Sequence, residues 1–316
     1  MTDPVNPARP ALALSVDVED WPQSSWDRRL SLGDYCADNT LRLLDLLGEF
    51  PSARATFFVL GKFARKHPAA VAAIRRAGHE IGSHGYGHVE LFHLGRKRFS
   101  EDLKRSTEVV AAAAGVRPAG YRAPDFSIVG ESLWALDVLA ESGYAYDSSI
   151  FPIRKARYGI PAWPRSPAIV RLGSGATITE LPLATLEFWG KRLPVGGGGY
   201  ARLMPAALLT EALQRAHAQL GAPPVFYCHP YEIDPGEFKR LDIHIPLKVR
   251  LHQGIGRKRT AAKLRRLLEN FECLSLGQAV QRLKDLPAIS YDAYVLDPAT
   301  VHRPPAFEGG QAVPDE

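Results

Sequence analysis

Apolar runs and helix-like patterns alternate along the chain. Short apolar runs that end at polar or turn residues predict strands over residues 11–17, 54–60, 79–83, 120–122, 176–181, 225–229 and 273–276. Patterns of helical period separate them and predict helices over residues 38–50, 68–78, 99–114, 131–143 and 205–220, with a further basic helix near 257–266. Repeated strand–helix units predict an α/β protein with a parallel sheet, and about seven strands predict a closed or nearly closed barrel.

Polar residues follow these predicted strands where each strand ends. They are Asp17, His84, Arg122, Asp147 and His229. In barrels of parallel strands the carboxyl ends of the strands form the catalytic face, so we expect these five side chains to meet there.

The pattern also predicts how the chain is divided. Residues 1–10 are expected to be an extension, 11–286 one barrel domain, and 287–316 an extended, partly disordered tail rich in Pro and acidic residues. The periodicity breaks over 151–171 and again over 194–200, where four glycines are consecutive, and both stretches are expected to be long loops over the rim. The glycines lack the Gly-Lys-Ser/Thr ending of a phosphate-binding loop, so no nucleotide site is expected.

The composition of the chain bears on the cellular compartment in which the protein is expected. The chain has 316 residues, of which 46% are hydrophobic and 23% charged, and no run approaches a transmembrane helix. Residues 1–10 lack the apolar centre of a secretory signal, which predicts a cytoplasmic protein. Three scattered cysteines fit free thiols in a reducing compartment.

The net charge of +5 comes largely from the basic helix. Its charged residues are Arg257, Lys258, Arg259, Lys263, Arg265 and Arg266. A solvated helix face is the preferred interpretation, and attraction to an anionic glycan or to lipid head groups is the alternative. No nucleic-acid motif accompanies these charges, so nucleic acid is not expected as a partner.

Two histidines four residues apart, His84 and His88, stand in Ser-His-Gly-Tyr-Gly-His. The glycines favour a loop, which can still direct both rings at one point. Upstream, Asp17-Val-Glu19-Asp20 ends the first apolar run, and three carboxylates so close together would repel one another without a cation or an arginine. Two imidazoles and one carboxylate form a three-ligand site that leaves a divalent metal open to water.

Acid–base groups can be assigned around that metal. Asp17, if it stays unligated, can take a proton from the water, and Arg122 can keep it ionised. His229 follows the apolar Val-Phe-Tyr-Cys and precedes a proline, so its strand should deliver the ring to the rim, where it can protonate a departing amine.

These segments, in this order, resemble the polysaccharide deacetylase family. The five motifs are Ser-Val-Asp17-Val-Glu-Asp-Trp, His84-Gly-Tyr-Gly-His88, Tyr-Arg122-Ala-Pro, Tyr-Asp147-Ser-Ser and Tyr227-Cys-His229. The chain looks closest to the branch associated with bacterial exopolysaccharide and exosortase clusters, similar to allantoinase-like and Helicobacter-type peptidoglycan deacetylases. The resemblance implies a distorted (β/α) barrel of about seven strands, with a subfamily-specific portion over about 150–286.

The resemblance also implies the roles. Asp17, Arg122, Asp147 and His229 would form the catalytic group, and the backbone N–H of Asp125 would hold the oxyanion. The cofactor would be a divalent metal, Zn²⁺ or else Co²⁺, Ni²⁺ or Mn²⁺.

Two departures from the family pattern bear on the site. The family's adjacent Asp-Asp pair is replaced, so the metal carboxylate is either Glu19 or Asp20. Glu19 is preferred because a step of two residues keeps it on the strand face of Asp17. Tyr227 replaces the usual leucine and would shape the pocket for the acetyl methyl group.

The predicted reaction is metal-dependent removal of N-acetyl groups from N-acetylhexosamine units of a bacterial exopolysaccharide or its lipid-linked precursor. The alternatives are a hydrolase of cyclic ureides or imides on the same scaffold, and a catalytically silent glycan-binding relic. Four tryptophans are candidates for a glycan groove, with core packing as the simpler explanation: Trp21, Trp26, Trp163 and Trp189. The basic helix could hold the protein at the inner membrane face. The oligomeric state is not predicted.

Overall fold

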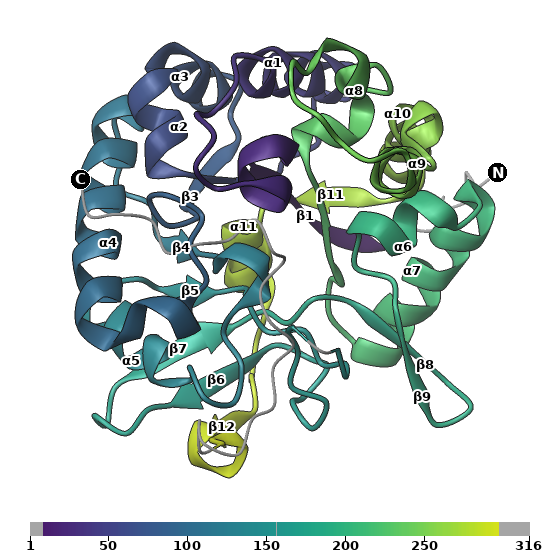
Figure 1. Cartoon of the computed structure of the whole chain (residues 1–316). Coiled ribbons are helices and arrows are strands. Elements are labelled where there is room, and N and C mark those ends of the chain that lie inside the picture. Colours follow the sequence, from purple (N-terminus) through teal and green to yellow (C-terminus); the bar gives the residue numbers. More distant parts are fainter. Residues whose placement is uncertain (1–8, 156, 297–316) are drawn as a thin grey trace, which may run out of the picture.

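A curved, mostly parallel sheet forms the centre of the molecule (Figure 1). The computed structural model describes residues 9–155 and 157–296. Seven strands follow one another as parallel neighbours in the order β10-β1-β2-β3-β4-β5-β7. Their bounds are β10 Val225–Cys228, β1 Ala11–Val18, β2 Thr56–Val59, β3 Glu80–Ser83, β4 Gly120–Tyr121, β5 Tyr146–Asp147 and β7 Thr177–Glu180. The predicted α/β barrel of about seven parallel strands is confirmed.

The sheet closes on itself just beyond β7. Leu183 forms a parallel bridge with Val225 of β10, and the amide of Ala184 donates a hydrogen bond to the carbonyl of Val225 at 3.1 Å. Gly197 forms a second parallel bridge, with Tyr227. Closure through single bridges rather than a full ladder makes the barrel distorted at this point.

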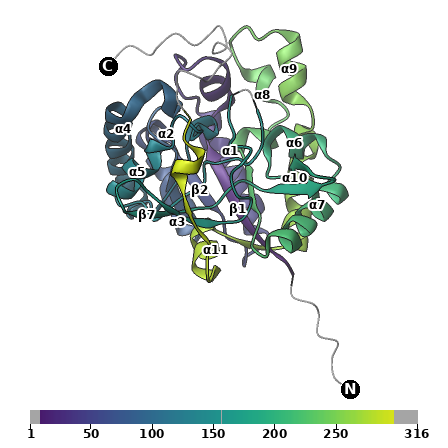
Figure 2. The same cartoon turned by 90° about the horizontal axis from the view of Figure 1, so that it is seen from below.

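Helices surround the sheet on the outside (Figures 1 and 2). Their bounds are α1 Tyr35–Gly48, α2 Gly61–Lys66, α3 Pro68–Arg76, α4 Leu91–Ala114, α5 Trp134–Glu141, α6 Gly198–Leu203, α7 Ala206–Leu220, α8 Glu237–Arg240, α9 Leu247–Gly254, α10 Arg257–Asn270 and α11 Leu276–Arg282. The largest core cluster joins α1, α3, α7 and α10 to strands β1, β2 and β10, whose alternate apolar residues face outward from the barrel. Apolar burial between sheet and helices is therefore the main stabilising contribution.

Additional strands lie outside the seven-strand path. β11 (Glu272–Leu274) pairs with the beginning of β1, and β6 (Ala168–Arg171) runs antiparallel to β7 and parallel to β12 (Ala288–Ser290). β8 (Thr185–Phe188) and β9 (Lys191–Pro194) form a separate hairpin. The expectation of a loop throughout 151–171 is wrong at its end, because β6 extends the sheet between β7 and β12. The predicted tail begins with β12, and its residues 297–316 lie outside the described part of the chain.

The glycine run also has a role other than a rim loop. Gly196 and Gly197 lie against β10, and a Cβ on Gly197, whose φ is +137°, would meet the carbonyl oxygen of Tyr227 at 2.0 Å. Only glycine permits this approach of two backbones. Gly198 then begins α6, so the run belongs to the closure of the barrel.

The basic helix α10 is not an open positive face. Arg257 is buried and paired with Glu237, and the Lys263 ammonium donates to the carbonyl oxygens of Ala201 and Arg202. Arg265 pairs with Glu49 at 2.7 Å. Half of the six basic residues thus make internal contacts. Among the described residues, no helix is both long and apolar enough to cross a bilayer.

Replacing Gly197 tests the closure. Gly197→Ala should lower the free energy of unfolding by about 2–4 kcal/mol, because the added Cβ overlaps the Tyr227 carbonyl. Gly48→Ala is the matched control, since its Cβ would have no atom within 4 Å, and it should change the free energy by less than about 0.5 kcal/mol. Urea denaturation measures both, and similar stabilities for the two variants would contradict this account of the closure.

Asp102 of α4 supports the loop that follows β3. Its carboxylate accepts a hydrogen bond from the Tyr86 amide at 3.0 Å. Burial raises the pKa of Asp102 to about 6, against the opposing effects of that hydrogen bond and of Arg105 and Lys62. The folded chain therefore holds this proton more tightly than the unfolded chain, whose pKa is about 3.9. The stabilising contribution is complete below about pH 4 and is lost as pH rises through about 6.

Asp102→Asn removes this titration while keeping an oxygen acceptor. At pH 8 the variant should exceed wild type in free energy of unfolding by about 1–2 kcal/mol, and near pH 4 the two should agree. Urea denaturation at both pH values measures the difference. A variant less stable than wild type at pH 8 would show that the charged carboxylate is the stabilising form.

Candidate functional site

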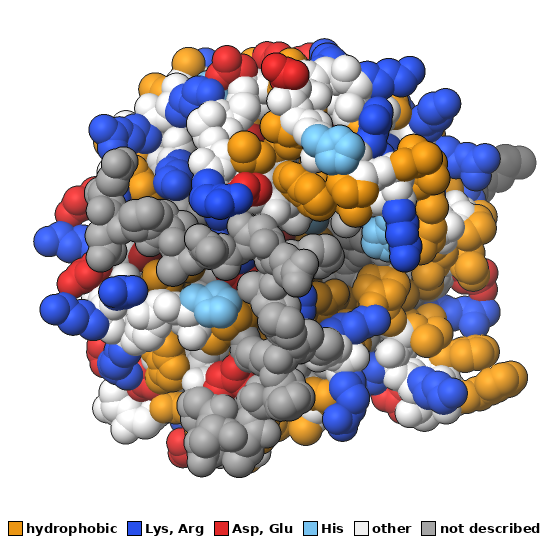
Figure 3. All heavy atoms as spheres, viewed as in Figure 1, with side chains coloured by type: hydrophobic (Ala, Val, Ile, Leu, Met, Phe, Trp, Pro, Cys, Tyr) orange, Lys and Arg blue, Asp and Glu red, His pale blue; other side chains and the backbone are white. Residues whose placement is uncertain are grey.

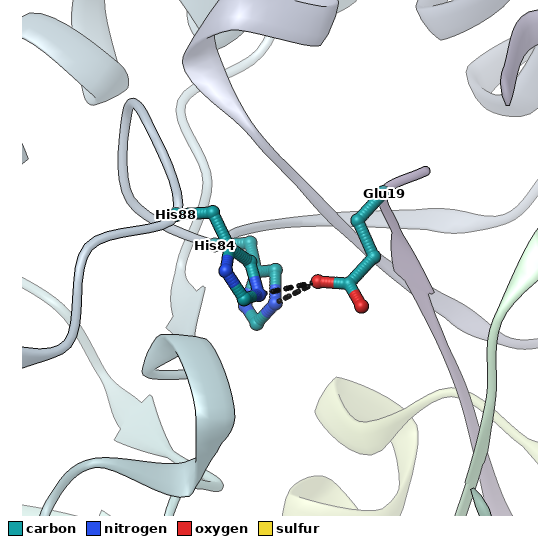
Figure 4. Close-up of side chains that lie close together, drawn as sticks. All are labelled: Glu19, His84 and His88. Carbon is teal, nitrogen blue, oxygen red and sulfur yellow. Dashed lines mark ion pairs between the residues drawn. The ribbon is translucent and has the colours of Figure 1, made fainter. Parts of the chain in front are cut away.

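Glu19, His84 and His88 meet at the carboxyl ends of β1 and β3 (Figure 4). The Glu19 Oε2 atom lies 2.5 Å from His88 Nε2 and 3.4 Å from His84 Nε2. All three side chains are buried, and their potential ligand atoms lie within 4.8 Å of one another. The two rings and the acid predicted from sequence therefore share one point.

The histidine loop orients both rings. His84 Nδ1 lies 2.8 Å from the Arg122 carbonyl oxygen, which only accepts, so Nδ1 carries the proton and Nε2 is free to bind a cation. His88 has a φ of +60° and Gly85 one of +74°, so the segment is a tight loop and not a helix. This left-handed conformation is unfavourable for histidine and turns its ring back toward Glu19.

The charges at this cluster depend on one another. Burial opposes a charge on His88, but the carboxylate of Glu19 outweighs it and raises the pKa of His88 to about 9. Burial likewise opposes a charge on Glu19, and the neighbouring His88, with His84 and His229, holds the pKa of Glu19 well below its usual range. A buried carboxylate surrounded by imidazole nitrogens is a site that favours positive charge.

This donor set fits a divalent cation. Two imidazole nitrogens and one carboxylate oxygen are the ligands that zinc and neighbouring metals take in hydrolases, with one position left for water. Within the described residues this is the group of His, Cys, Asp or Glu side chains that satisfies the distances for a metal site.

Asp17 lies beside the cluster in a buried ion pair. Its Oδ1 accepts a hydrogen bond from Arg122 Nη1 at 2.8 Å. The same nitrogen donates to Ser15 Oγ at 2.7 Å, and the rest of the guanidinium donates to the carbonyl and hydroxyl of Ser148. Arg122 is thus fully engaged and fixes the position of the Asp17 side chain.

His229 closes the other side of the cluster. Its Nε2 lies 3.4 Å from Glu19 Oε1, and its Nδ1 lies 3.6 Å from Glu232 Oε1. Burial lowers its pKa, but the contact with Glu232 and the charges of Glu19 and Asp17 outweigh that effect, so the net pKa is raised. The Tyr231 ring stacks on the imidazole with centroids 4.7 Å apart. The raised pKa favours the protonated form of His229, and the stacking fixes the plane of its ring.

A cavity of about 160 Å³ opens over these groups. Its lining residues are Asp17, Glu19, Ser25, His84, His88, Ala123, Asp125, Phe126, Tyr158, Tyr227, His229 and Tyr231. The predicted Tyr227 is among them. An aromatic wall opposite a polar, cation-binding floor can receive a small neutral group such as an acetamide.

Asp125 lies on the cavity wall with a φ of +52°. Its carboxylate is 3.0 Å from Arg157, which also lies 3.0 Å from Glu90. Arg28 pairs with Glu90 as well. Two arginines and two acids thus form a charge-balanced network at the side of the cavity.

Besides Arg122, which lies behind Asp17, three sequence-predicted residues do not line the cavity. Asp20 turns its carboxylate to the amides of Gly33, at 2.6 Å, and Gln23, at 3.0 Å, so Glu19 is the acid that faces the imidazoles. Trp21 is buried in a cluster with Tyr231 and Ile245. The expectation that Trp21 contacts substrate is wrong because its indole packs in the core.

Asp147 is the third of these residues, and it lies behind the residues that line the cavity. Its oxygens accept hydrogen bonds from the amide and hydroxyl of Ser149, and that hydroxyl accepts one from the Ala123 amide at 2.7 Å. Beside it, burial and the charge of Asp147 raise the pKa of Glu180 well above its usual range. Asp147 therefore positions the strand that carries Arg122 and does not face the cavity.

The other tryptophans do not line the cavity either. Trp163 is fully buried, and Trp26 stacks on Trp21. Trp189 stands at the turn of the β8–β9 hairpin with 90% of its surface exposed. The cavity's aromatic wall is instead made of Phe126, Tyr158, Tyr227 and Tyr231.

Two residues that support the site, Ser15 and Glu232, could have been found from their spacing in the sequence. Ser15 precedes Asp17 by two residues, so the two share a strand face, and both contact Arg122. Glu232 follows His229 by three residues, the spacing of a capping box, and its Oε2 accepts from the His229 amide at 3.4 Å. Ser25, in a short π-helical turn (Pro22–Trp26), and Tyr158, in an irregular segment, carried no such signal.

Two family models match the chain in succession. Residues 20–146 match the family described as polysaccharide deacetylase, and residues 148–281 match a domain of unknown function, DUF3473. The boundary between them falls directly after Asp147. The cavity draws His84, His88 and Asp125 from the first region and Tyr227 and His229 from the second.

Curated relatives and solved structures agree with this match. A peptidoglycan-N-acetylglucosamine deacetylase of Bacillus cereus is 33% identical over 99 residues, 31% of this chain and 36% of that protein. A peptidoglycan deacetylase of Helicobacter pylori is 32% identical over 111 residues, 34% of this chain and 36% of that protein. The chain spans less than half the length of the curated relatives it matches.

A structure described as a putative polysaccharide deacetylase from Mycobacterium smegmatis covers 96% of this chain and 100% of its own, with a TM-score of 0.58 and 24% identity. That likeness shows the shared fold over nearly the whole chain. Residues 20–146 are therefore similar to the polysaccharide deacetylase family, and residues 148–281, which follow almost directly, are similar to a domain of unknown function.

Proposed function

We propose that this protein is a metal-dependent hydrolase that removes N-acetyl groups from N-acetylhexosamine units of a bacterial polysaccharide. The observation that carries the proposal is the buried Glu19, His84 and His88 cluster with Asp17 and His229 on the same small cavity. The names of the peptidoglycan deacetylases it resembles support an acetylated glycan as substrate. Among such glycans we favour an exopolysaccharide or its lipid-linked precursor, in keeping with the branch that the sequence resembles.

The cation would be held by Glu19, His84 and His88, and Zn²⁺ is the metal that best suits two imidazoles and a carboxylate in a buried site. A divalent cation bound there polarises an amide carbonyl and makes water acidic enough to be deprotonated near neutral pH. Asp20 would remain a loop-capping residue.

The residues of the chain supply the proton transfers. Asp17 takes a proton from the attacking water, and Arg122, at 2.8 Å, holds the Asp17 carboxylate in position. The backbone N–H of Asp125 stabilises the oxyanion of the tetrahedral intermediate. His229 then donates its Nε2 proton to the departing nitrogen, because an amide nitrogen cannot leave as an anion.

The surrounding residues prepare these groups. Glu232 favours the protonated form of His229, and Tyr231 fixes the plane of its ring. Asp147, through Ser149 and Ala123, positions the segment that carries Arg122 and Asp125. Tyr227 and Phe126 form an apolar pocket for the acetyl methyl group. On this proposal both family regions, residues 11–286 as one barrel, are needed for activity.

The substrate class is tested by acetate release. Metal-loaded protein is incubated with N-acetylglucosamine oligomers, with an acetylated exopolysaccharide fragment and, in parallel, with allantoin as a cyclic ureide. Acetate release from the oligosaccharides supports the proposal. Ureide hydrolysis without acetate release identifies the alternative amidohydrolase, and metal binding without any turnover identifies a glycan-binding relic.

If Asp17 and His229 transfer protons, replacing either residue should lower kcat without lowering the amount of bound metal. Asp17→Asn and His229→Gln should each lower kcat by about 10²–10⁴-fold, the usual contribution of a positioned acid or base, while bound metal stays near one equivalent. His252→Gln, in exposed helix α9, is the control and should retain wild-type kcat. Near-normal turnover by either cavity variant would overturn the role assigned to that residue.

The ligand assignment predicts different outcomes for two adjacent acids. Glu19→Gln should weaken metal binding by about 100-fold or more, because it removes a ligand. Asp20→Asn should retain the metal, because the carboxylate of Asp20 accepts hydrogen bonds from the Gly33 and Gln23 amides and does not face the imidazoles. Metal content after dialysis, measured by inductively coupled plasma mass spectrometry, separates the two, and the opposite ranking would make Asp20 the ligand.

A further inference from the structure

Helix α9 exposes a row of aliphatic side chains. Leu247, Leu251 and Ile255 are 69%, 60% and 50% exposed, and none of the helix's residues is buried. Their spacing of four residues places them on one face of the helical segment. Val249, on a different face, packs against the cluster of Trp21, Tyr231 and Ile245. The helix is therefore anchored on one side and presents an apolar face to solvent on the other.

A neighbouring leucine extends this face. Arg202 of α6 donates a hydrogen bond to the Gln253 carbonyl at 2.8 Å, and a Cβ on Gly256 would lie 2.4 Å from the Arg202 carbonyl oxygen. The next residue, Leu203, is 67% exposed. Leu203, Leu247, Leu251 and Ile255 are called the rim patch below.

Only positive charge accompanies the rim patch in sequence. Residues 243–268 contain eight Lys or Arg residues and no Asp or Glu. Arg257, Lys263 and Arg265 have internal partners, as described above. The other five are exposed: Lys248, Arg250, Lys258 and Arg259 near the rim patch, and Arg266 toward the far end of α10. Basic side chains beside exposed leucines are the pattern of helices that lie in the surface of an anionic membrane.

The rim patch lies at the end of the barrel where the cavity opens. In Figure 2 the chain enters β1 from the N-terminus at the bottom, and α8 and α9 stand at the top. β1 carries Asp17 near its upper end, and Glu19 follows it. Tyr231 links the two features, since it lines the cavity and belongs to the cluster on which Val249 packs.

Other occupants fit the rim patch less well. Four aliphatic side chains are far fewer than the 20–30 residues a side of a stable protein interface. A second copy docked face to face would also bring the exposed Lys and Arg residues of both chains together. A glycan would be expected to meet aromatic side chains, and the patch has none. A bilayer accepts a small apolar face, and its acidic head groups complement the flanking charges.

We propose that the rim patch docks this protein peripherally on a membrane surface that contains acidic phospholipids, with the cavity directed toward that surface. Leu203, Leu247, Leu251 and Ile255 enter the acyl boundary, and the exposed Lys248, Arg250, Lys258 and Arg259 contact the head groups. This inference goes beyond the proposed deacetylation and does not require it. A substrate whose glycan is attached to a membrane lipid would then be presented directly to the cavity.

Vesicle co-sedimentation tests the docking with the full chain. Wild-type protein should bind vesicles of phosphatidylglycerol and phosphatidylcholine at least tenfold more tightly than vesicles of phosphatidylcholine alone, and 0.5 M salt should weaken the binding. Leu247→Glu combined with Leu251→Glu should reduce binding to the acidic vesicles at least tenfold, and Lys248→Ala combined with Arg250→Ala should reduce it less and remove part of the salt effect.

Val116→Glu is the matched control. Val116 is 41% exposed and precedes β4, so it lies at the opposite end of the barrel, and this variant should bind as wild type does. Circular dichroism and acetate release from a soluble oligosaccharide check that the leucine variants remain folded. Failure of acetate release in wild type would overturn the proposed function while leaving the vesicle result intact.

Two results would overturn the docking proposal. One is wild-type protein that does not bind acidic vesicles, or binds them as the double leucine variant does. The other is a wild-type dimer in analytical ultracentrifugation that Leu251→Glu dissociates, which would make the patch an interface between two copies.

Discussion

The buried ion pair between Arg122 and Asp17 is the interaction on which the site depends. Neither side chain is more than marginally exposed, and Arg122 donates to Asp17, Ser15 and both oxygens of Ser148. Removing one partner of such a buried pair typically costs about 3–5 kcal/mol, because the other charge is left uncompensated. Since these contacts join β1, β4 and the segment after β5, the pair fixes three elements of the barrel relative to one another.

The same arginine connects Asp17 with the cluster of Glu19, His84 and His88. Its carbonyl oxygen accepts a hydrogen bond from His84 Nδ1, while its guanidinium donates to Asp17. One residue thus sets the tautomer of His84 and the position of the carboxylate beside it. This explains why the His84 imidazole and the Asp17 carboxylate lie within one small cavity, although they come from strands far apart in sequence.

Much of the fold, and the cluster of Glu19, His84 and His88, could be predicted from sequence. Hydrophobic periodicity and the ends of strands are local properties of the chain. The apolar run ending at Asp17 and the glycines around His84 and His88 are read without tertiary contacts. Asp147 is different. It also follows a strand, but its partners are Ser149 and the neighbouring Glu180, so its carboxylate points behind the wall. The place of a residue along a strand predicts at which end of the barrel it lies. Only packing decides whether its side chain faces the cavity or the residues behind it.

The predictions from sequence that proved wrong failed for the same reason, because they depended on tertiary packing. Trp21 stands next to the acidic cluster in sequence, but the turn after β1 directs its indole into a core cluster with Phe238, at a centroid distance of 4.8 Å. The glycine run contains no information about its neighbour, and its role becomes visible only when Gly197 is found against the Tyr227 carbonyl. The six basic residues share one helix, but whether each is free depends on acids such as Glu49 and Glu237, which lie elsewhere in the chain.

Backbone strain is concentrated on the cavity wall, and the buried network explains how it persists. His88, Asp125 and Phe126 all have φ values between +52° and +60°, which side chains of their size rarely adopt and which cost of order 1–3 kcal/mol each. Each of these residues is held by contacts from another element: His88 by Glu19, Asp125 by Arg157, and Phe126 by the ring of Tyr227 at 4.9 Å. Tyr227 and Arg157 both lie beyond residue 148, in the region that matches the domain of unknown function. That second region therefore does more than contribute His229, because it also stabilises the unusual loop conformations on the wall of the cavity, in the region that matches the deacetylase family.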